Sequence, residues 1–64
     1  MITNREKAEC AEREVKQRRR VYARWVAEGR MTQPFADRQI ETMAAIAGDY
    51  RALADAEDIA GRLL

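Results

Sequence analysis

One short stretch, Gly29-Arg30-Met31-Thr32-Gln33-Pro34, is the main break in the helical pattern of this 64-residue chain. Gly29 is well placed to follow the end of a helix, because a positive φ at that position costs little only for glycine. Thr32 is a good N-cap, and Pro34 falls in the first turn of a following helix, where its missing amide proton costs nothing. The stretch therefore predicts a short turn between two helices.

The first helix is predicted over residues 4–28. Thr3-Asn4-Arg5-Glu6 has the pattern of a capping box, in which the Thr3 hydroxyl accepts from the Glu6 amide and the Glu6 carboxylate reaches back to the Thr3 amide. No Gly or Pro interrupts the segment from Asn4 to Glu28. Its apolar stripe at helical spacing consists of Ala8, Ala11, Val15, Tyr22 and Val26.

The second helix is predicted over residues 34–56. Its apolar residues alternate spacings of four and three, a heptad-like seam whose small members permit close helix approach. The seam consists of Ala36, Ile40, Met43, Ala47, Tyr50 and Ala54. After Asp55 the pattern changes phase, because Ile59 and Leu63 lie far from this stripe. Residues 57–64 are therefore expected to form a tail or a separate short helix.

Two helices of similar length joined by a turn at residues 29–33 predict a single all-α domain, an antiparallel two-helix hairpin over residues 1–64. A chain this short is marginally stable alone, and two helices cannot enclose a core. Apolar residues beside both stripes need a further partner surface, and a C2 homodimer forming a coiled-coil-like four-helix bundle supplies it. The candidate dimer-interface residues are Val21, Trp25, Phe35, Ile46 and Leu53.

The composition argues against an enzyme. The chain has no Ser and no His, so a Ser-His-Asp constellation is excluded. Its single cysteine, Cys10, has no imidazole to activate it, forms no disulfide within the chain and is too little for a zinc site. No Gly-rich phosphate loop is present. The sequence predicts no catalytic residues, no metal site and no cofactor.

The expected location is the cytoplasm. The segment Met1-Ile2-Thr3-Asn4-Arg5-Glu6-Lys7 lacks the apolar core of a signal peptide, and no apolar run approaches membrane-spanning length. An unpaired thiol fits a reducing compartment. No membrane association is expected.

Charge is divided unevenly along the chain. Residues 1–31 hold nine basic and five acidic side chains, net +4, whereas residues 32–64 hold three basic and six acidic, net −3. On a helical wheel a basic ridge of Arg13, Lys16, Arg20 and Arg24 lies opposite the first apolar stripe. A nucleic-acid-binding reading uses these residues together with Arg19.

The alternative reading of the ridge is a solvated or salt-bridged surface, and it is favoured. Acid-first i,i+4 pairs are available for Glu9–Arg13, Glu12–Lys16 and Glu14–Arg18. Tyr22 and Trp25 belong to the apolar side and so are not beside the ridge to stack on bases. Arg18 lies at the edge of the apolar stripe and is expected to pair across to an acid of the second helix. The candidate acids are Asp37, Glu41 and Asp49.

A longer pattern resembles a known group of small proteins. It runs Arg18-Arg19-Arg20-Val21-Tyr22-x-Arg24-Trp25-Val26-x-x-Gly29-Arg30-Met31, followed by Ala36-Asp37-Arg38-x-Ile40-x-x-Met43-x-x-Ile46-x-x-Asp49-Tyr50. The chain is similar in this respect, over roughly residues 12–54, to small helical proteobacterial and phage-associated proteins. The resemblance implies a bacterial or prophage origin and a helical hairpin, and it implies no activity. In those relatives a Pro follows the Val-Tyr pair, whereas Ala23 stands here, which implies a straighter first helix.

The expected function is that of a homo-oligomeric helical protein-interaction module, with a nucleic-acid-binding helical bundle as the alternative. The two make different demands on the basic ridge of the assembled dimer. The interaction module predicts that acids of the second helix neutralise the ridge in that dimer. Nucleic-acid binding requires the ridges of both subunits to form one continuous positive face.

Overall fold

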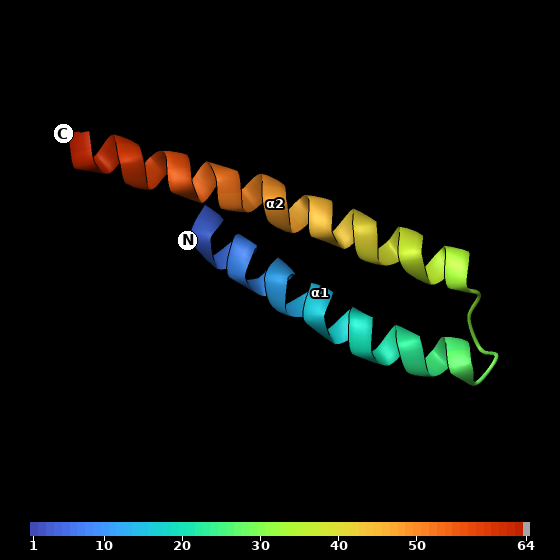
Figure 1. Cartoon of the computed structure of the whole chain (residues 1–64). Helices are drawn as coiled ribbons and strands as arrows, with labels where there is room; N and C mark the ends of the chain where they lie inside the picture. The colour runs from blue at the N-terminus through green and yellow to red at the C-terminus, as the bar shows by residue number, and fades with distance from the viewer. Residues whose placement is uncertain (64) are drawn as a thin grey trace.

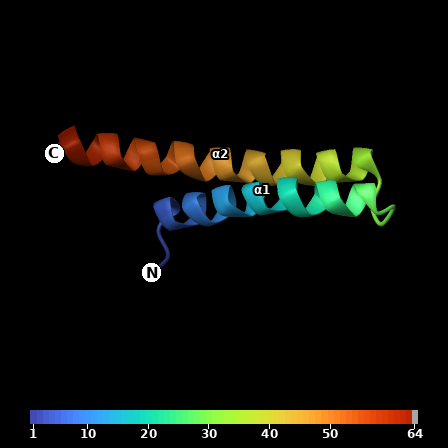
Figure 2. The same ribbon diagram turned by 60° about the horizontal axis from the view of Figure 1, so that its bottom comes forward.

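The computed structural model of the protein describes residues 1–63, which form two α-helices packed side by side (Figure 1). Helix α1 spans Asn4–Ala27 and helix α2 spans Gln33–Leu63. They run antiparallel as a rod with extents of 53 × 18 × 15 Å, and a turn closes one end (Figure 2). The predicted all-helical hairpin is confirmed, with the helix ends beside the turn within one residue of the predicted positions.

The N-terminus of α1 carries half of the expected capping box. The Thr3 hydroxyl accepts from the Glu6 amide at 3.1 Å. The Glu6 carboxylate does not reach the Thr3 amide; it accepts instead from the Thr3 hydroxyl at 3.3 Å. The Thr3 hydroxyl thus contacts both the amide and the carboxylate of Glu6. The negative charge of Glu6 at this end is favourable with the helix dipole.

A Schellman motif ends α1. Gly29 has a φ of +75°, as its position in the sequence predicts. The Arg30 amide donates to the Trp25 carbonyl at 2.8 Å, and the Gly29 amide donates to the Val26 carbonyl at 3.0 Å. These bonds satisfy carbonyls at the end of the helix and reverse the chain.

Thr32 starts α2 as predicted. Its hydroxyl accepts from the Phe35 amide at 3.4 Å, and its carbonyl accepts from the Ala36 amide at 3.0 Å. Pro34 lies in the first turn, where it removes no hydrogen bond. The local chemistry of the turn therefore fixes where both helices begin and end.

The expected end of the second helix at residue 56 is wrong, because α2 continues without interruption to Leu63. The phase change of the apolar stripe does not break the backbone, since four of the residues from 57 to 63 are good helix formers, namely Glu57, Ala60, Arg62 and Leu63. The phase change instead leaves Ile59 and Leu63 exposed, at 56% and 82%. The last residue of the expected tail, Leu64, lies outside the described residues.

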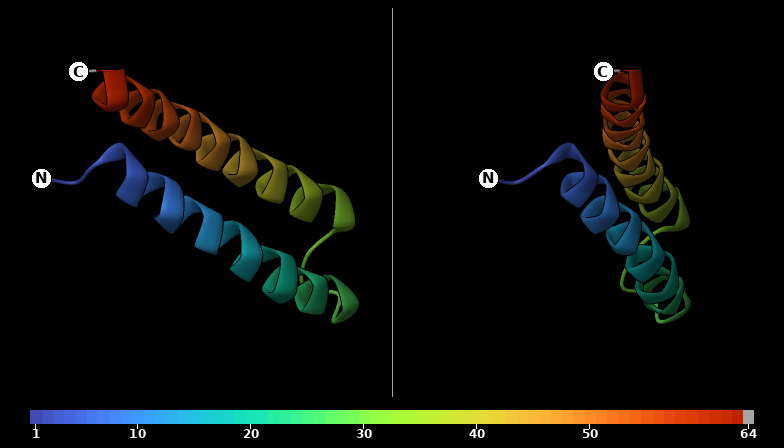
Figure 3. Two further views of the ribbon diagram at one scale, coloured as in Figure 1. Left: turned by 60° about the vertical axis from the view of Figure 1, so that its left-hand side comes forward. Right: turned by 90° about the vertical axis from the view of Figure 1, so that its left-hand side faces the viewer.

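The core between the helices is a thin seam of alanines. Five side chains are buried, with exposed fractions of 0–6%: Ala8, Ala11, Ala36, Ala47 and Ala54. The larger members of the two predicted stripes are half-buried, namely Val15, Tyr22, Val26, Ile40, Met43 and Tyr50. The small residues let the helices lie close along their length (Figure 3). Both predicted stripes therefore face this seam, but within residues 1–63 no large side chain is fully enclosed.

Candidate interaction surface

One long side of the hairpin, the apolar face, carries Cys10, Val21 and Trp25 from α1 and Phe35, Met43, Ile46, Tyr50 and Leu53 from α2. Phe35, Ile46 and Leu53 fall within about 20° of arc at 100° per residue. They are 54%, 40% and 49% exposed. Val21 and Trp25 are half-buried on the adjoining flank of α1. The five candidate interface residues thus share one side of the hairpin.

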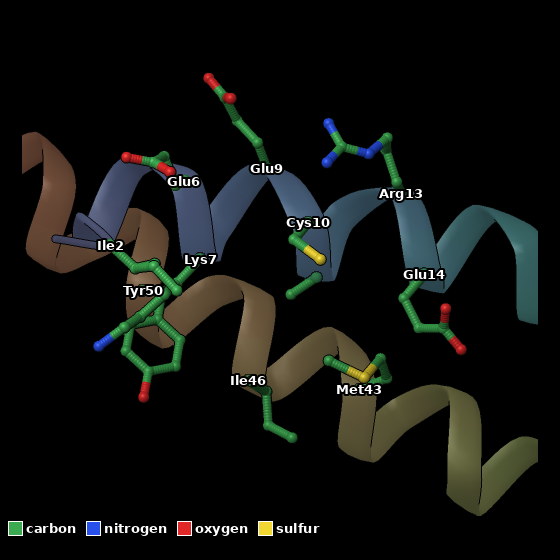
Figure 4. Close-up of a pocket in the computed structure, with 11 residues that line it drawn as sticks. Ile2, Glu6, Lys7, Glu9, Cys10, Arg13, Glu14, Met43, Ile46 and Tyr50 are labelled. Atoms are coloured by element: carbon green, nitrogen blue, oxygen red, sulfur yellow. The ribbon is translucent and has the colours of Figure 1, made fainter.

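Near the open end this face is hollowed into a groove of about 620 Å³ between the helices. Its lining includes Ile2, Cys10, Glu14, Met43, Ile46 and Tyr50. The Lys7 ammonium lies 5.1 Å from the centre of the Tyr50 ring, whereas Glu9 and Arg13 point away from the groove (Figure 4). Apolar side chains therefore form most of the floor, and charged groups stand at its edges.

At the turn end the aromatic residues are flanked by arginines. The rings of Tyr22 and Trp25 stack with centroids 5.6 Å apart and planes 23° from parallel. The Arg30 guanidinium lies 5.2 Å from the Trp25 ring centre, and that of Arg18 lies 6.0 Å from the Tyr22 ring centre. The apolar pattern predicts that the rings lie on the packed side, but it does not reveal these cations. The i,i+4 spacing of Arg18 and Tyr22 is the signal in the sequence for one of them.

Arg18 does not pair with an acid of α2. Its Nε donates to Glu14 at 3.0 Å, and a terminal nitrogen donates to the Gln39 carbonyl at 3.2 Å. The expectation of a partner among Asp37, Glu41 and Asp49 is wrong, because the acid one turn earlier on the same helix is closer. Arg18 nevertheless links the two helices, through the backbone of α2.

The ion pairs that do join the helices lie toward the open end. Arg51 donates two hydrogen bonds to the Glu12 carboxylate, at 3.0 and 2.8 Å. This bidentate contact lowers the pKa of Glu12 and raises the pKa of Arg51. Two further contacts cross nearer the ends, Arg5 with Asp58 and Asn4 with Glu57. The Asp58 contact raises the pKa of Arg5.

The i,i+4 spacing favours Lys16 as the partner of Glu12 and does not reveal the Glu12–Arg51 contact. The register of the hairpin contains the signal. An antiparallel pair of helices centred on a turn near residue 30 brings residue 12 level with about residue 49. Arg51 is the basic residue of α2 within reach of that level.

The basic ridge is exposed along α1. Arg13, Arg20 and Arg24 are exposed, and Arg13 is one of the residues around the larger groove, whereas Lys16 and Arg19 line a second, smaller groove of about 390 Å³. Across residues 1–63, none of these five side chains has a carboxylate oxygen within 4.0 Å. Acids of α2 therefore leave the ridge unneutralised within one hairpin.

The described part of the chain contains no cluster of three or more His, Cys, Asp or Glu side chains able to hold a metal ion. In residues 1–63 neither helix has the combination of length and apolar character needed to span a bilayer. Comparison with protein-family models, with curated proteins and with solved structures finds no match to this chain.

Proposed function

We propose that the protein is a homo-oligomeric helical interaction module, in which two hairpins pack through their apolar faces into a four-helix bundle. The bundle then presents its charged outer surface to a protein partner. In this arrangement Phe35, Ile46 and Leu53 leave water together with Val21 and Trp25.

The observation that carries this proposal is an excess of accessible surface. The hairpin exposes 4988 Å². A compact monomer of its 7.4 kDa mass is expected to expose about 4,200 Å². The excess of roughly 800 Å² matches the share that one partner contributes to a standard protein interface. The exposed side chains of Phe35, Ile46 and Leu53 form an apolar line along α2, which is the kind of surface that such an interface covers.

The composition of the seam supports the same proposal. Its five buried side chains are alanines, each of which contributes little apolar area. Chains of this size usually need a further source of stability, and association is the one that fits a chain with a single cysteine. Dimerisation through the apolar face would give the half-buried aromatic and aliphatic side chains a second layer.

Sedimentation equilibrium combined with circular dichroism tests the dimer. The wild-type chain should sediment as a dimer at micromolar concentration. Ile46→Glu should shift it toward monomer and lower its helical content, because the charge lies at the centre of the apolar face. Ile59→Glu is the matched control, since Ile59 is 56% exposed but lies off that face. A folded, helical wild-type monomer at tens of micromolar would overturn the proposal.

A second function is supported by one observation, the absence of carboxylate partners for the ridge within residues 1–63. Unpaired arginines on one helix side are available to phosphates. The test is titration with mixed RNA and DNA at two salt concentrations. Binding that strengthens several-fold at low salt and is lost in Arg20→Glu/Arg24→Glu, but not in Arg62→Glu, would favour nucleic acid over a protein partner.

A further inference from the structure

The hairpin carries opposite charge at its two ends. Its turn half, residues 18–45, contains six basic and three acidic side chains, net +3. Its open half, residues 1–17 and 46–64, contains six basic and eight acidic side chains, net −2. The net charges of residues 1–31 and 32–64 do not reveal this difference between the ends, because each helix contributes residues to both ends of the hairpin. The folded molecule is therefore polar along its 53 Å length.

We infer that a second copy of the chain docks on the apolar face in the antiparallel sense, with the turn half of each hairpin over the open half of the other. The inference rests on the proposed dimer and supplies its orientation. Two twofold arrangements can cover this face. One places α1 on α1 and α2 on α2 with the turns at opposite ends, and the other places both turns at the same end.

Charge separates these two arrangements. With the turns at opposite ends, the turn half of each hairpin, net +3, faces the open half of the other, net −2. With the turns at one end, two +3 halves meet and two −2 halves meet. The axes of packed helices in a bundle lie about 8–10 Å apart, close to one Debye length at physiological ionic strength, so the charge of one half is only partly screened from the half that it faces. The antiparallel dimer is attractive along its whole length, whereas the other repels at both ends.

The apolar line on α2 fits the same orientation. Phe35 precedes Ile46 by 11 residues and Leu53 follows it by 7, so the midpoint of the line is residue 44. That point lies about 3 Å from Ile46 along the helix, at 1.5 Å per residue. When α2 packs antiparallel on α2, Phe35 comes level with Leu53 of the partner subunit, and Ile46 lies near the twofold axis. Each exposed apolar residue of the line then has an apolar neighbour.

Distances between spin labels in the full chain test the orientation. Cys10→Ser removes the native thiol, and Glu28→Cys then places one label beside the turn, where Glu28 is exposed. The antiparallel dimer predicts about 35–40 Å between the two labels, from the length of α1 at 1.5 Å per residue. Turns at the same end would bring the labels within roughly 20 Å, two helix diameters. That short distance would overturn the orientation while leaving the dimer intact.

A label at the opposite end provides the complementary measurement. Arg62→Cys in the Cys10→Ser background should give about 50 Å between like labels. Mixing Glu28→Cys and Arg62→Cys chains should give a short distance between unlike labels, within roughly 20 Å. Loss of every intermolecular distance, together with sedimentation as a monomer, would overturn both the dimer and its orientation.

Charge variants change the dissociation constant of the dimer, and the direction of the change depends on the orientation of the two hairpins. Arg20→Gln/Arg24→Gln lowers the turn half from +3 to +1 and removes two exposed residues without ion pairs in the described chain. The antiparallel dimer should dissociate about two- to fivefold more readily at low salt, and less so at high salt. Arg62→Gln, which makes the open half more negative, should have the opposite effect. A tighter dimer in Arg20→Gln/Arg24→Gln would contradict the inference, because it shows that like ends meet.

Discussion

The two ends of the hairpin hold α1 against α2 by different means. At the turn end the chain is reversed by Gly29 and its Schellman hydrogen bonds, and stacked aromatic rings lie beside Arg18 and Arg30. At the open end, cross-helix contacts run through carboxylates, foremost the Glu12–Arg51 pair. The difference teaches that one helical pair can depend on backbone geometry at one end and on charge at the other. Each end should therefore respond to its own perturbations.

The largest expected effect comes from overfilling the seam at each end. Ala36→Leu near the turn and Ala54→Leu near the open end each insert a large side chain where the alanine is 1% or 2% exposed. Overpacking typically costs 1–3 kcal/mol, and we expect the larger loss at Ala36, because the turn prevents the helices from separating. Urea unfolding measures both, with the exposed Ala45→Leu as control, expected within about 0.5 kcal/mol of wild type. An equal loss in the free energy of unfolding in Ala36→Leu and Ala54→Leu would contradict the proposed difference between the two ends.

The next effect isolates the backbone at the turn. Gly29→Ala should lower the free energy of unfolding by about 1–2 kcal/mol, because its φ of +75° disfavours any side chain. Gly48→Ala, inside α2, should raise it by up to about 1 kcal/mol. A Cβ at either site meets no atom within 4 Å. A difference between the two variants therefore reports on backbone conformation and not on side-chain packing. A stabilised Gly29→Ala would show that the Schellman turn does not govern this end.

Acid should act on the open end. The bidentate contact with Arg51 holds the pKa of Glu12 below its ordinary 4.5. The stability it gives is therefore present above about pH 4.5 and is lost as pH falls through the lower folded-state pKa. Unfolding curves from pH 7 to pH 2 should show this decline. Glu12→Gln and Arg51→Gln should flatten it alike, since either change removes the pair, and an unchanged slope in both would contradict the assignment.

The smallest effect concerns the turn end alone. The contact of Arg30 with Trp25 should contribute roughly 0.5 kcal/mol, as cation–π pairs do at exposed sites. A double-mutant cycle with Arg30→Gln and Trp25→Leu measures it. The coupling should persist at pH 3, where carboxylate contacts at the open end are weakened. A coupling that vanishes with acid would mean that the two ends are not independent.

The parts of this fold that the sequence predicts are those set by local chemistry. Thr3, Gly29 and Thr32 each act within a few residues, so the beginning of α1 and the whole turn follow from them. The spacing of the alanines likewise predicts the face that each helix turns to the other. These signals require no knowledge of how the helices are placed in space.

The contacts that the sequence does not predict depend on competition between partners. Glu12 has Lys16 one turn away, yet it pairs with Arg51, because the hairpin register brings a guanidinium fork to its carboxylate. Arg18 makes the opposite choice and keeps its local acid, Glu14, in the i,i+4 pair that helical spacing offers. Helical spacing alone does not determine whether a side chain pairs within its own helix or across to the other helix. The end of α2 does not follow from the apolar pattern for a related reason. An apolar phase change alters which residues are covered and leaves backbone hydrogen bonding intact.

The unequal lengths of the helices give the molecule a gradient of amide protection. α2 has 31 residues against 24 in α1, so its final turns extend beyond the contact of Arg5 with Asp58 (Figure 1). From Ile59 to Leu63 its helical hydrogen bonds have no neighbouring helix to support them. In deuterated water, among the helical amides of α2, those of this overhang should exchange first and those beside Ala47, in the middle of the seam, last. The order of exchange would thus run from the free end of α2 toward the packed middle of the hairpin.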